Sequence, residues 1–157
     1  MPTKTTGSHH GFALGRRIVE LSEAADWDRA RLEWRIEDIY IQRKPETCLC
    51  GHFPINELCV LRNRKNHNRA IVGNVCVKKF MKLSSDRMFA AIKRVTADET
   101  KAFNVHVIEH AFAKRWINDW ERDFYLDTWR KRKLSARQMT KRREINRKVL
   151  ARVRTNR

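Results

Sequence analysis

Residues 47–80, TCLCGHFPINELCVLRNRKNHNRAIVGNVCVKKF, decide the fold of the first half of the chain, because they hold all four of its cysteines. The cysteines follow the spacing C-x-C-x8-C-x16-C, and Gly51 stands directly after the second one. Thiolates are common zinc ligands, and a glycine here permits the tight backbone turn of a zinc knuckle. We therefore expect a Zn²⁺ site formed by Cys48, Cys50, Cys59 and Cys76, with His52 as an alternative ligand.

Two other uses of the cysteines stay open at this point. Buried free cysteines behave as small apolar side chains and pack in protein cores. Disulfides are the second alternative, but they are rare in reducing compartments. Residues 1–17 contain no apolar segment of the kind that a secretory signal carries, so we expect a cytoplasmic protein in which the cysteines bind metal.

The sequence around the cysteines predicts a hairpin and a helix. ELCVLRNR and RAIVG flank the polar run KNHN, which favours a β-hairpin, and GNVCVKKF favours a turn followed by a helix with Cys76 in its first turn. This order of knuckle, hairpin and helix over residues 46–83 resembles a treble-clef zinc finger, which implies a structural zinc ion. Treble clefs commonly carry C-x2-C at both ends, whereas this chain has C-x-C and a single helical cysteine. The segment is also similar to a cysteine module of small, uncharacterised bacterial and phage proteins.

Outside the cysteine region the periodicity of apolar residues predicts mostly helix, so the expected fold class is α+β and mainly helical, with the finger packed against C-terminal helices. We expect a strand over 34–42 and a long helical stretch over 100–132. A final helix should begin near Ser135. The expected organisation is a flexible N-terminus over 1–11, one globular domain over 12–132 and a basic C-terminal helix over 133–157.

The charge of the chain indicates a polyanionic partner. The formal net charge is +17, and residues 130–157 hold thirteen Lys or Arg against one acidic residue. Residues 61–82 hold seven cations and no acid. Such an excess favours DNA or RNA, held through its phosphates with low sequence specificity. The expected contacts are Arg62, Arg64, Lys65, Arg69, Lys78, Lys79, Arg130, Lys131, Arg132, Lys133, Arg137, Lys141, Arg142, Arg143, Arg147 and Lys148.

The C-terminal third supplies a second resemblance and an alternative function. WINDWERDFYLDTWRKRKLSARQ, residues 116–138, resembles a pattern found in bacterial and phage proteins linked to DNA transactions. That resemblance implies a prokaryotic cell or a phage-infected host. The alternative is an interaction protein that docks on a host nucleoprotein complex. It would use the apolar stripe Ile145, Val149 and Val153 of the last helix.

Two enzyme motifs are present but lack the residues that their chemistry needs. His106, Glu109 and His110 spell H-x-x-E-H, which resembles the zinc site of inverted zinc peptidases, a class with far larger chains. The run NHN at 66–68 resembles the motif of His-Me nucleases, but residues 77–80 of the following helix offer no ligand for a catalytic metal. We therefore expect a non-catalytic protein, with a His-Me-type nuclease as a further alternative, and we expect neither a small-molecule substrate nor membrane association.

Overall fold

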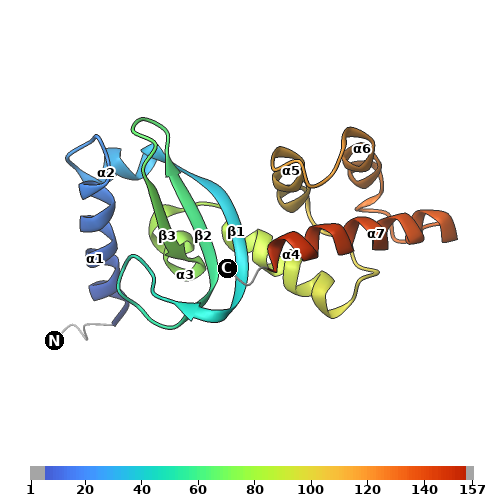
Figure 1. Ribbon diagram of the computed structural model, residues 1–157, viewed down its shortest axis with the longest axis horizontal. Coiled ribbons are helices and arrows are strands. Elements are labelled where there is room, and N and C mark those ends of the chain that lie inside the picture. Colours follow the sequence, from blue (N-terminus) through green and yellow to red (C-terminus); the bar gives the residue numbers. More distant parts are fainter. Residues whose placement is uncertain (1–5, 155–157) are drawn as a thin grey trace. The chain divides into compact units, whose positions relative to one another are not determined.

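The structure is a computed structural model that describes the backbone of residues 6–154 and the side chains of residues 11–154. The described chain is α+β and about half helical, with one three-stranded antiparallel sheet in the order β1-β2-β3. It divides after Ser85 into two compact units, which are described separately below. Figure 1 shows the elements of each unit.

The first unit contains the sheet and the cysteines. Its elements are α1 (Thr6–Glu20), α2 (Trp27–Ala30), the 3-10 turn η1 (Arg31–Glu33), β1 (Trp34–Glu46), β2 (Ile55–Asn63), β3 (Arg69–Gly73), α3 (Asn74–Cys76) and the π-helical turn η2 (Val77–Met81). The predicted strand, hairpin and cysteine-bearing helix are all present. Asp26 caps α2 by accepting a hydrogen bond from the Arg29 amide, which explains why this short helix begins where it does.

A buried carboxylate joins the N-terminal helices to the sheet. Glu33 is 4% exposed, and it accepts hydrogen bonds from the backbone amides of Glu23 and Ala24 at 2.9 and 2.8 Å. It also accepts one from the Asn63 side chain at 2.7 Å. The Asn63 bond and the two amides lower the pKa of Glu33, although burial opposes them. Glu33 is therefore a structural anion whose charge is stabilised by hydrogen bonds.

Asparagines build the tip of the β2–β3 hairpin. The side-chain oxygen of Asn63 accepts from the Lys65 and Asn66 amides, and His67 adopts a positive φ of 64°. The side chains of Asn66 and Asn68 both donate to the Leu21 carbonyl at 2.9 Å. The NHN run therefore stabilises the turn, as Asn side chains commonly do, and it connects the hairpin to the residue after α1 through hydrogen bonds.

The second unit is helical. Its elements are α4 (Ser85–Ala97), α5 (Val105–Ala113), α6 (Asp119–Thr128) and α7 (Ala136–Val153), of which α4 begins on the last residue of the first unit. Large buried side chains from all four helices and the α4–α5 loop form its core: Phe89, Ile92, Phe103, Ile108, Tyr125 and Ile145. The Tyr125 hydroxyl donates to Asn146 at 2.6 Å and accepts from the Phe103 amide at 2.8 Å, so it is satisfied inside this core.

The long helix expected over 100–132 is wrong, because the structure has two helices there. The chain turns between α5 and α6, where Arg115 adopts a positive φ of 59°. Asn118 then starts α6 with a capping box, in which its side chain accepts from the Glu121 amide and Glu121 accepts from the Asn118 amide. A capping box satisfies the free backbone amides at the start of a helix. The sequence N-x-x-E at Asn118 therefore marks the beginning of a second helix within the apolar pattern.

The boundaries of the units also differ from the expected organisation. The division after Ser85 falls inside the segment 12–132 that the sequence suggested as one domain. Helix α7 is an integral part of the second unit, because Ile145, Val149 and Val153 are fully buried there. The apolar stripe therefore builds a core and offers no docking surface. Residues 1–5 of the expected flexible N-terminus lie outside the described residues, and residues 6–11 belong to α1.

Candidate metal centre and basic surfaces

Three of the four cysteines converge in the first unit. The sulfur atoms of Cys48, Cys50 and Cys76 lie within 4.8 Å of one another, and all three side chains are buried. Tetrahedral zinc with Zn–S bonds near 2.3 Å separates its sulfurs by about 3.8 Å, so only small side-chain adjustments would seat an ion here. The donor set of buried thiols at this spacing fits a metal ion.

Local backbone structure presents the first two thiols. The Cys48 amide donates to the His52 carbonyl at 2.9 Å, and the Gly51 amide donates to the Cys48 carbonyl at 2.8 Å, which closes a tight turn. Gly51 sits at φ +92° in open space, a conformation that favours glycine. The Cys50 sulfur accepts from the His52 amide at 3.4 Å. These bonds hold residues 48–52 in a tight turn.

The third thiol comes from the helix after β3. Cys76 ends α3, whose N-cap is Gly73. The Gly73 amide donates to the Cys48 sulfur at 3.2 Å, and the Leu49 amide donates to the Ile71 carbonyl at 3.0 Å. The turn over residues 48–52 is therefore hydrogen-bonded to β3, directly before the helix that carries Cys76.

The electrostatics of the three thiols favour a shared negative charge. A hydrogen bond from the Cys76 thiol, aided by the Gly73 amide, lowers the pKa of Cys48 to about 5 against the cost of burial. That bond in turn raises the pKa of Cys76, and burial raises the pKa of Cys50. A bound cation would displace the protons of Cys50 and Cys76 and allow all three sulfurs to ionise.

Cys59 does not join the cluster of three sulfurs, so the site predicted from four cysteines has three of them. It lies on β2, fully buried between Ile39 and Val72 in the register of the sheet. Burial raises the pKa of its thiol to about 12, as expected for a core cysteine. Among the described residues, neither His52 nor His67 belongs to the cluster, and His67 lies at the opposite end of the hairpin.

The basic residues of the first unit include two arginines that share one carboxylate and several exposed cations. Arg62 and Arg69 both bind the carboxylate of Glu37, at 2.9 and 2.8 Å. Arg64 and Lys65 are exposed at the hairpin tip, and Lys78 and Lys79 are exposed on η2. The sequence identified these cations but missed Glu37, which lies 25 residues before Arg62 and becomes its neighbour only through strand pairing.

Many cations of α7 are engaged within the second unit. Arg143 and Arg147 both bind Glu99, at 2.7 and 2.9 Å, and they lower its pKa to about 2. Lys148 binds the buried carboxylate of Glu121 at 2.8 Å, and Lys141 lies 4.0 Å from the same group. These four residues hold α7 against the rest of the unit, so they are poorer candidates for phosphate contacts than the sequence suggested.

Arg142 is a structural residue, which corrects its assignment as a phosphate contact. Its side chain is 5% exposed, and its guanidinium donates to the Thr128 carbonyl at 2.7 Å and to the Thr100 carbonyl at 3.5 Å. Burial lowers its pKa. A cation enclosed by carbonyl groups cannot reach an external phosphate.

Replacing Arg142 by glutamine should destabilise the second unit by about 2–4 kcal/mol, because two buried carbonyls lose their donor. Urea unfolding followed by circular dichroism measures the loss. The exposed neighbour Arg143 is the control, and its glutamine variant should cost less than about 1 kcal/mol. Unchanged stability of the variant together with weaker nucleic-acid binding would instead show that Arg142 contacts phosphate.

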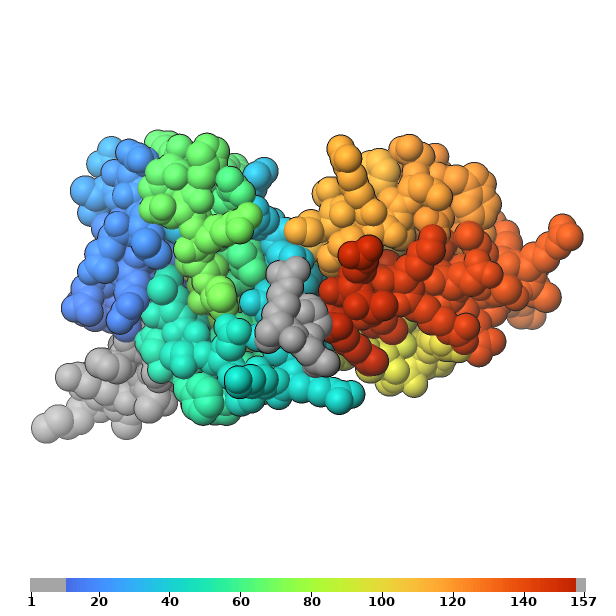
Figure 2. Space-filling view, viewed as in Figure 1, coloured from blue at the N-terminus to red at the C-terminus, as the bar shows by residue number. Residues whose placement is uncertain are grey.

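The loop between α6 and α7 carries cations without carboxylate partners. The four Lys and Arg residues of this loop and Arg137 in the first turn of α7 are exposed, and none forms an ion pair with a described residue: Arg130, Lys131, Arg132, Lys133 and Arg137. We call them the α6–α7 cation loop. Arg130 additionally stacks over Trp129 at 4.7 Å. Side chains of this orange-red segment extend into solvent in Figure 2.

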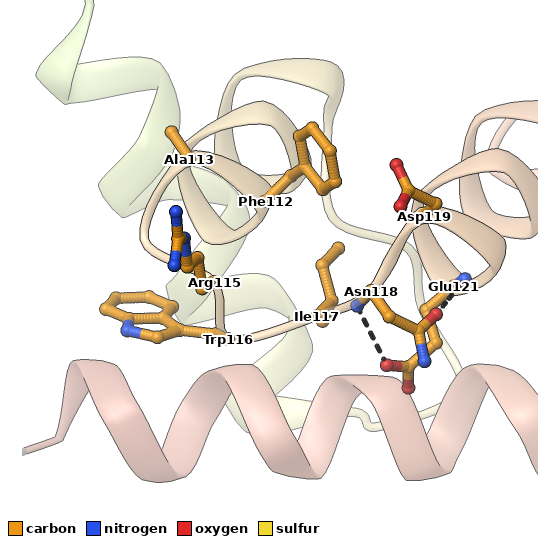
Figure 3. Close-up of a pocket in the computed structure, with 8 residues that line it drawn as sticks. All are labelled: Phe112, Ala113, Arg115, Trp116, Ile117, Asn118, Asp119 and Glu121. Atoms are coloured by element: carbon orange, nitrogen blue, oxygen red, sulfur yellow. Dashed lines mark hydrogen bonds between the residues drawn. The ribbon is translucent and has the colours of Figure 1, made fainter.

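The peptidase-like motif is part of the helical packing. Glu109 binds Arg122 at 2.8 Å, and the His110 ring packs edge-on against Trp116 with centroids 5.4 Å apart. Among the described residues, His106, Glu109 and His110 form no cluster with a further metal ligand. In the neighbouring pocket of Figure 3, Asn118 and Glu121 are hydrogen-bonded to each other in the capping box of α6.

The described part of the chain thus offers two chemical features, a cluster of three thiols and exposed unpaired cations. Thiols at this spacing can hold a soft or borderline divalent cation such as zinc. Unpaired surface cations can hold phosphates. Among the helices within residues 6–154, none is both long enough and apolar enough to cross a membrane. Comparison with protein-family models, curated proteins and solved structures finds no match to this chain.

Proposed function

We propose that this protein is a non-catalytic nucleic-acid-binding protein whose first unit is stabilised by zinc. The observation that carries the proposal is the α6–α7 cation loop, in which five exposed cations have no carboxylate partner among the described residues. Clustered like charges repel one another and destabilise the free protein, so a polyanion is their natural partner. The exposed cations of the hairpin tip and η2 add a second basic surface.

The metal in this proposal is a structural Zn²⁺ ion in a treble-clef-like finger. Knuckle, hairpin β2–β3 and helix α3 follow the order of that motif, and the thiols come from the knuckle and the helix. Zinc requires a fourth ligand beyond the three thiolates. Water, the His52 imidazole or a reoriented Cys59 would supply it. The ion would fix the knuckle and η2, and with them the cations of η2.

Binding across a salt series tests the proposal. The full-length protein, with its metal content measured on the same sample, is titrated with single- and double-stranded DNA and RNA between 50 and 300 mM salt. If the five loop cations each contact one phosphate, log K should fall against log salt with a slope of at least about −3.5 to −4.5. One zinc per chain is expected. A slope near zero would reject nucleic-acid binding, and metal-free folded protein would reject the zinc site.

A docking role on a nucleoprotein complex is the second candidate. It retains the basic surfaces but not the apolar stripe of α7, which is buried. In this case the cations would contact acidic protein surface or ribonucleoprotein, and free nucleic acid would bind weakly. The salt series distinguishes the two functions.

A further inference from the structure

Three arginines form a row across the sheet of the first unit. Arg35 on β1 pairs with Arg62 on β2, and Arg62 pairs with Arg69 on β3. Residues directly opposite in antiparallel strands point to the same face of a sheet. The three side chains therefore share one face, a feature that the linear sequence conceals because the residues are widely separated in the chain.

One carboxylate organises two of these arginines. Glu37, 20% exposed, accepts from Nη1 of Arg62 at 2.9 Å, and it binds Arg69 through Nε at 2.8 Å and Nη2 at 3.1 Å. Burial raises the pKa of Glu37, but the hydrogen bonds from Arg62 and Arg69 outweigh it, and the pKa is lowered. The carboxylate stays ionised and holds both guanidiniums, which keep N–H groups that are not directed at it.

The charge around the row remains positive. Arg35 is exposed and has no carboxylate partner among the described residues. Together the three arginines and Glu37 carry a net charge of about +2, and Arg64 and Lys65 follow at the hairpin tip. The next row along the same face contains Asp38, which is only 9% exposed, opposite Val60 and Ile71. The exposed charge on this face is therefore mainly positive, and Ile71 adds an exposed apolar side chain beside the row.

We propose that Arg35, Arg62 and Arg69 form a built phosphate-binding row that holds the backbone of a nucleic acid, with Glu37 as its positioning residue. Neighbouring strands lie about 4.8 Å apart, so the row extends about 10 Å. Nucleic acid carries one phosphate per about 3.4 Å of axis on each strand, so the row spans more than one phosphate. Guanidiniums bind phosphates bidentately, which gives this surface a geometry that scattered lysines lack.

This inference rests on the proposed function but assigns it a surface in the first unit, separate from the α6–α7 cation loop. Arg35 was absent from the residues that the sequence indicated. Its contribution depends on the strand register, which places it beside Arg62.

The first test removes the row. The full-length variant R35Q/R62Q/R69Q is compared with R17Q/R43Q/K44Q, which loses three exposed cations from the same unit. The row variant should bind the preferred nucleic acid about 100-fold more weakly at 0.1 M salt, with a salt slope shallower by about 2–2.7. The control should change affinity less than about 3-fold. Equal effects of the two variants would overturn the row. Metal content and circular dichroism of both variants show whether the first unit is folded.

The second test separates geometry from charge. R62K/R69K keeps the charge but loses the forked guanidiniums, so binding should weaken about 5- to 10-fold. E37Q removes one negative charge, so a purely electrostatic effect would strengthen binding. If Glu37 positions the arginines, E37Q should weaken it instead, by about 3-fold or more. Stronger binding by E37Q would show that Glu37 does not position the arginines. Unchanged binding by R62K/R69K would show that the row acts through its charge alone.

The third test does not depend on nucleic acid. Arginine Nε–H resonances of the full-length protein are followed by NMR during titration with inorganic phosphate and with tripolyphosphate. Resonances of Arg35, Arg62 and Arg69 should shift before those of Arg17 and Arg43. Selective shifts in a protein that fails the salt series would reject the proposed function and keep the row as a phosphate site. Absence of selective shifts would overturn the row even if nucleic acid binds elsewhere.

Discussion

If the three thiols hold zinc as proposed, replacing Cys76 by serine is expected to abolish zinc binding and to unfold the first unit. Structural zinc contributes about 10–16 kcal/mol in isolated fingers, which matches or exceeds the total stability of a typical domain, about 5–15 kcal/mol. The three clustered thiols join the knuckle to the helix after β3, so loss of one ligand separates these segments. Metal analysis and thermal unfolding measure both effects. A strong chelator should act on the wild type in the same way.

Cys59 supplies the matched control. It is as buried as the clustered cysteines but does not belong to their group. The variant C59A should keep one zinc per chain, and it should lose only about 1–2 kcal/mol from the smaller core side chain. The second unit contains none of the cysteines and should keep its own unfolding transition in both variants. Loss of zinc from C59A would identify Cys59 as the fourth ligand.

Neutralising the α6–α7 cation loop is expected to produce the largest loss of binding. The variant R130Q/K131Q/R132Q/K133Q removes four exposed cations, and if each contacts a phosphate, affinity at 0.1 M salt should fall on the order of 100- to 1000-fold. The salt slope should become shallower by about 3. Fluorescence anisotropy with a labelled oligonucleotide measures both quantities.

The control for the loop is a variant with equal charge. R87Q/K101Q/R152Q/R154Q loses four exposed cations from the second unit but leaves the loop intact. It should weaken binding far less, because its cations are dispersed. Both variants should unfold within about 0.5 kcal/mol of the wild type, since the changed side chains are exposed. Equal losses of affinity would show that net charge, and not the loop, determines binding.

Local signals in the sequence predicted much of the fold. Alternation and turn residues located β1 and the hairpin, and Ser135 marked the start of α7, where it forms a capping box with Gln138. The same kind of signal was missed at Asn118, where apolar spacing continued across a helix break. Periodicity describes which residues face the core, but capping decides where a helix begins.

Long-range pairing could not be predicted. Glu99 binds Arg143 and Arg147 across 44 and 48 residues, and no local pattern in the sequence indicates these ion pairs. Nothing in the spacing of the cysteines separated Cys59 from the other three, because the convergence of sulfur atoms depends on the tertiary structure. The approach of Cys48 to Cys50 follows from a local turn, whereas Cys76 reaches them through the long-range bonds from Leu49 to Ile71 and from Gly73 to the Cys48 sulfur.

The hydrogen bond from the Leu49 amide to the Ile71 carbonyl has a consequence for solubility. β3 is an outer strand of the sheet, and its residues RAIVG are rich in side chains that favour strands. An uncovered strand of this kind is a template for pairing with another chain. The knuckle occupies this edge only while its own turn is held in place. If this turn opened, the outer edge of β3 would become available for pairing with a second chain.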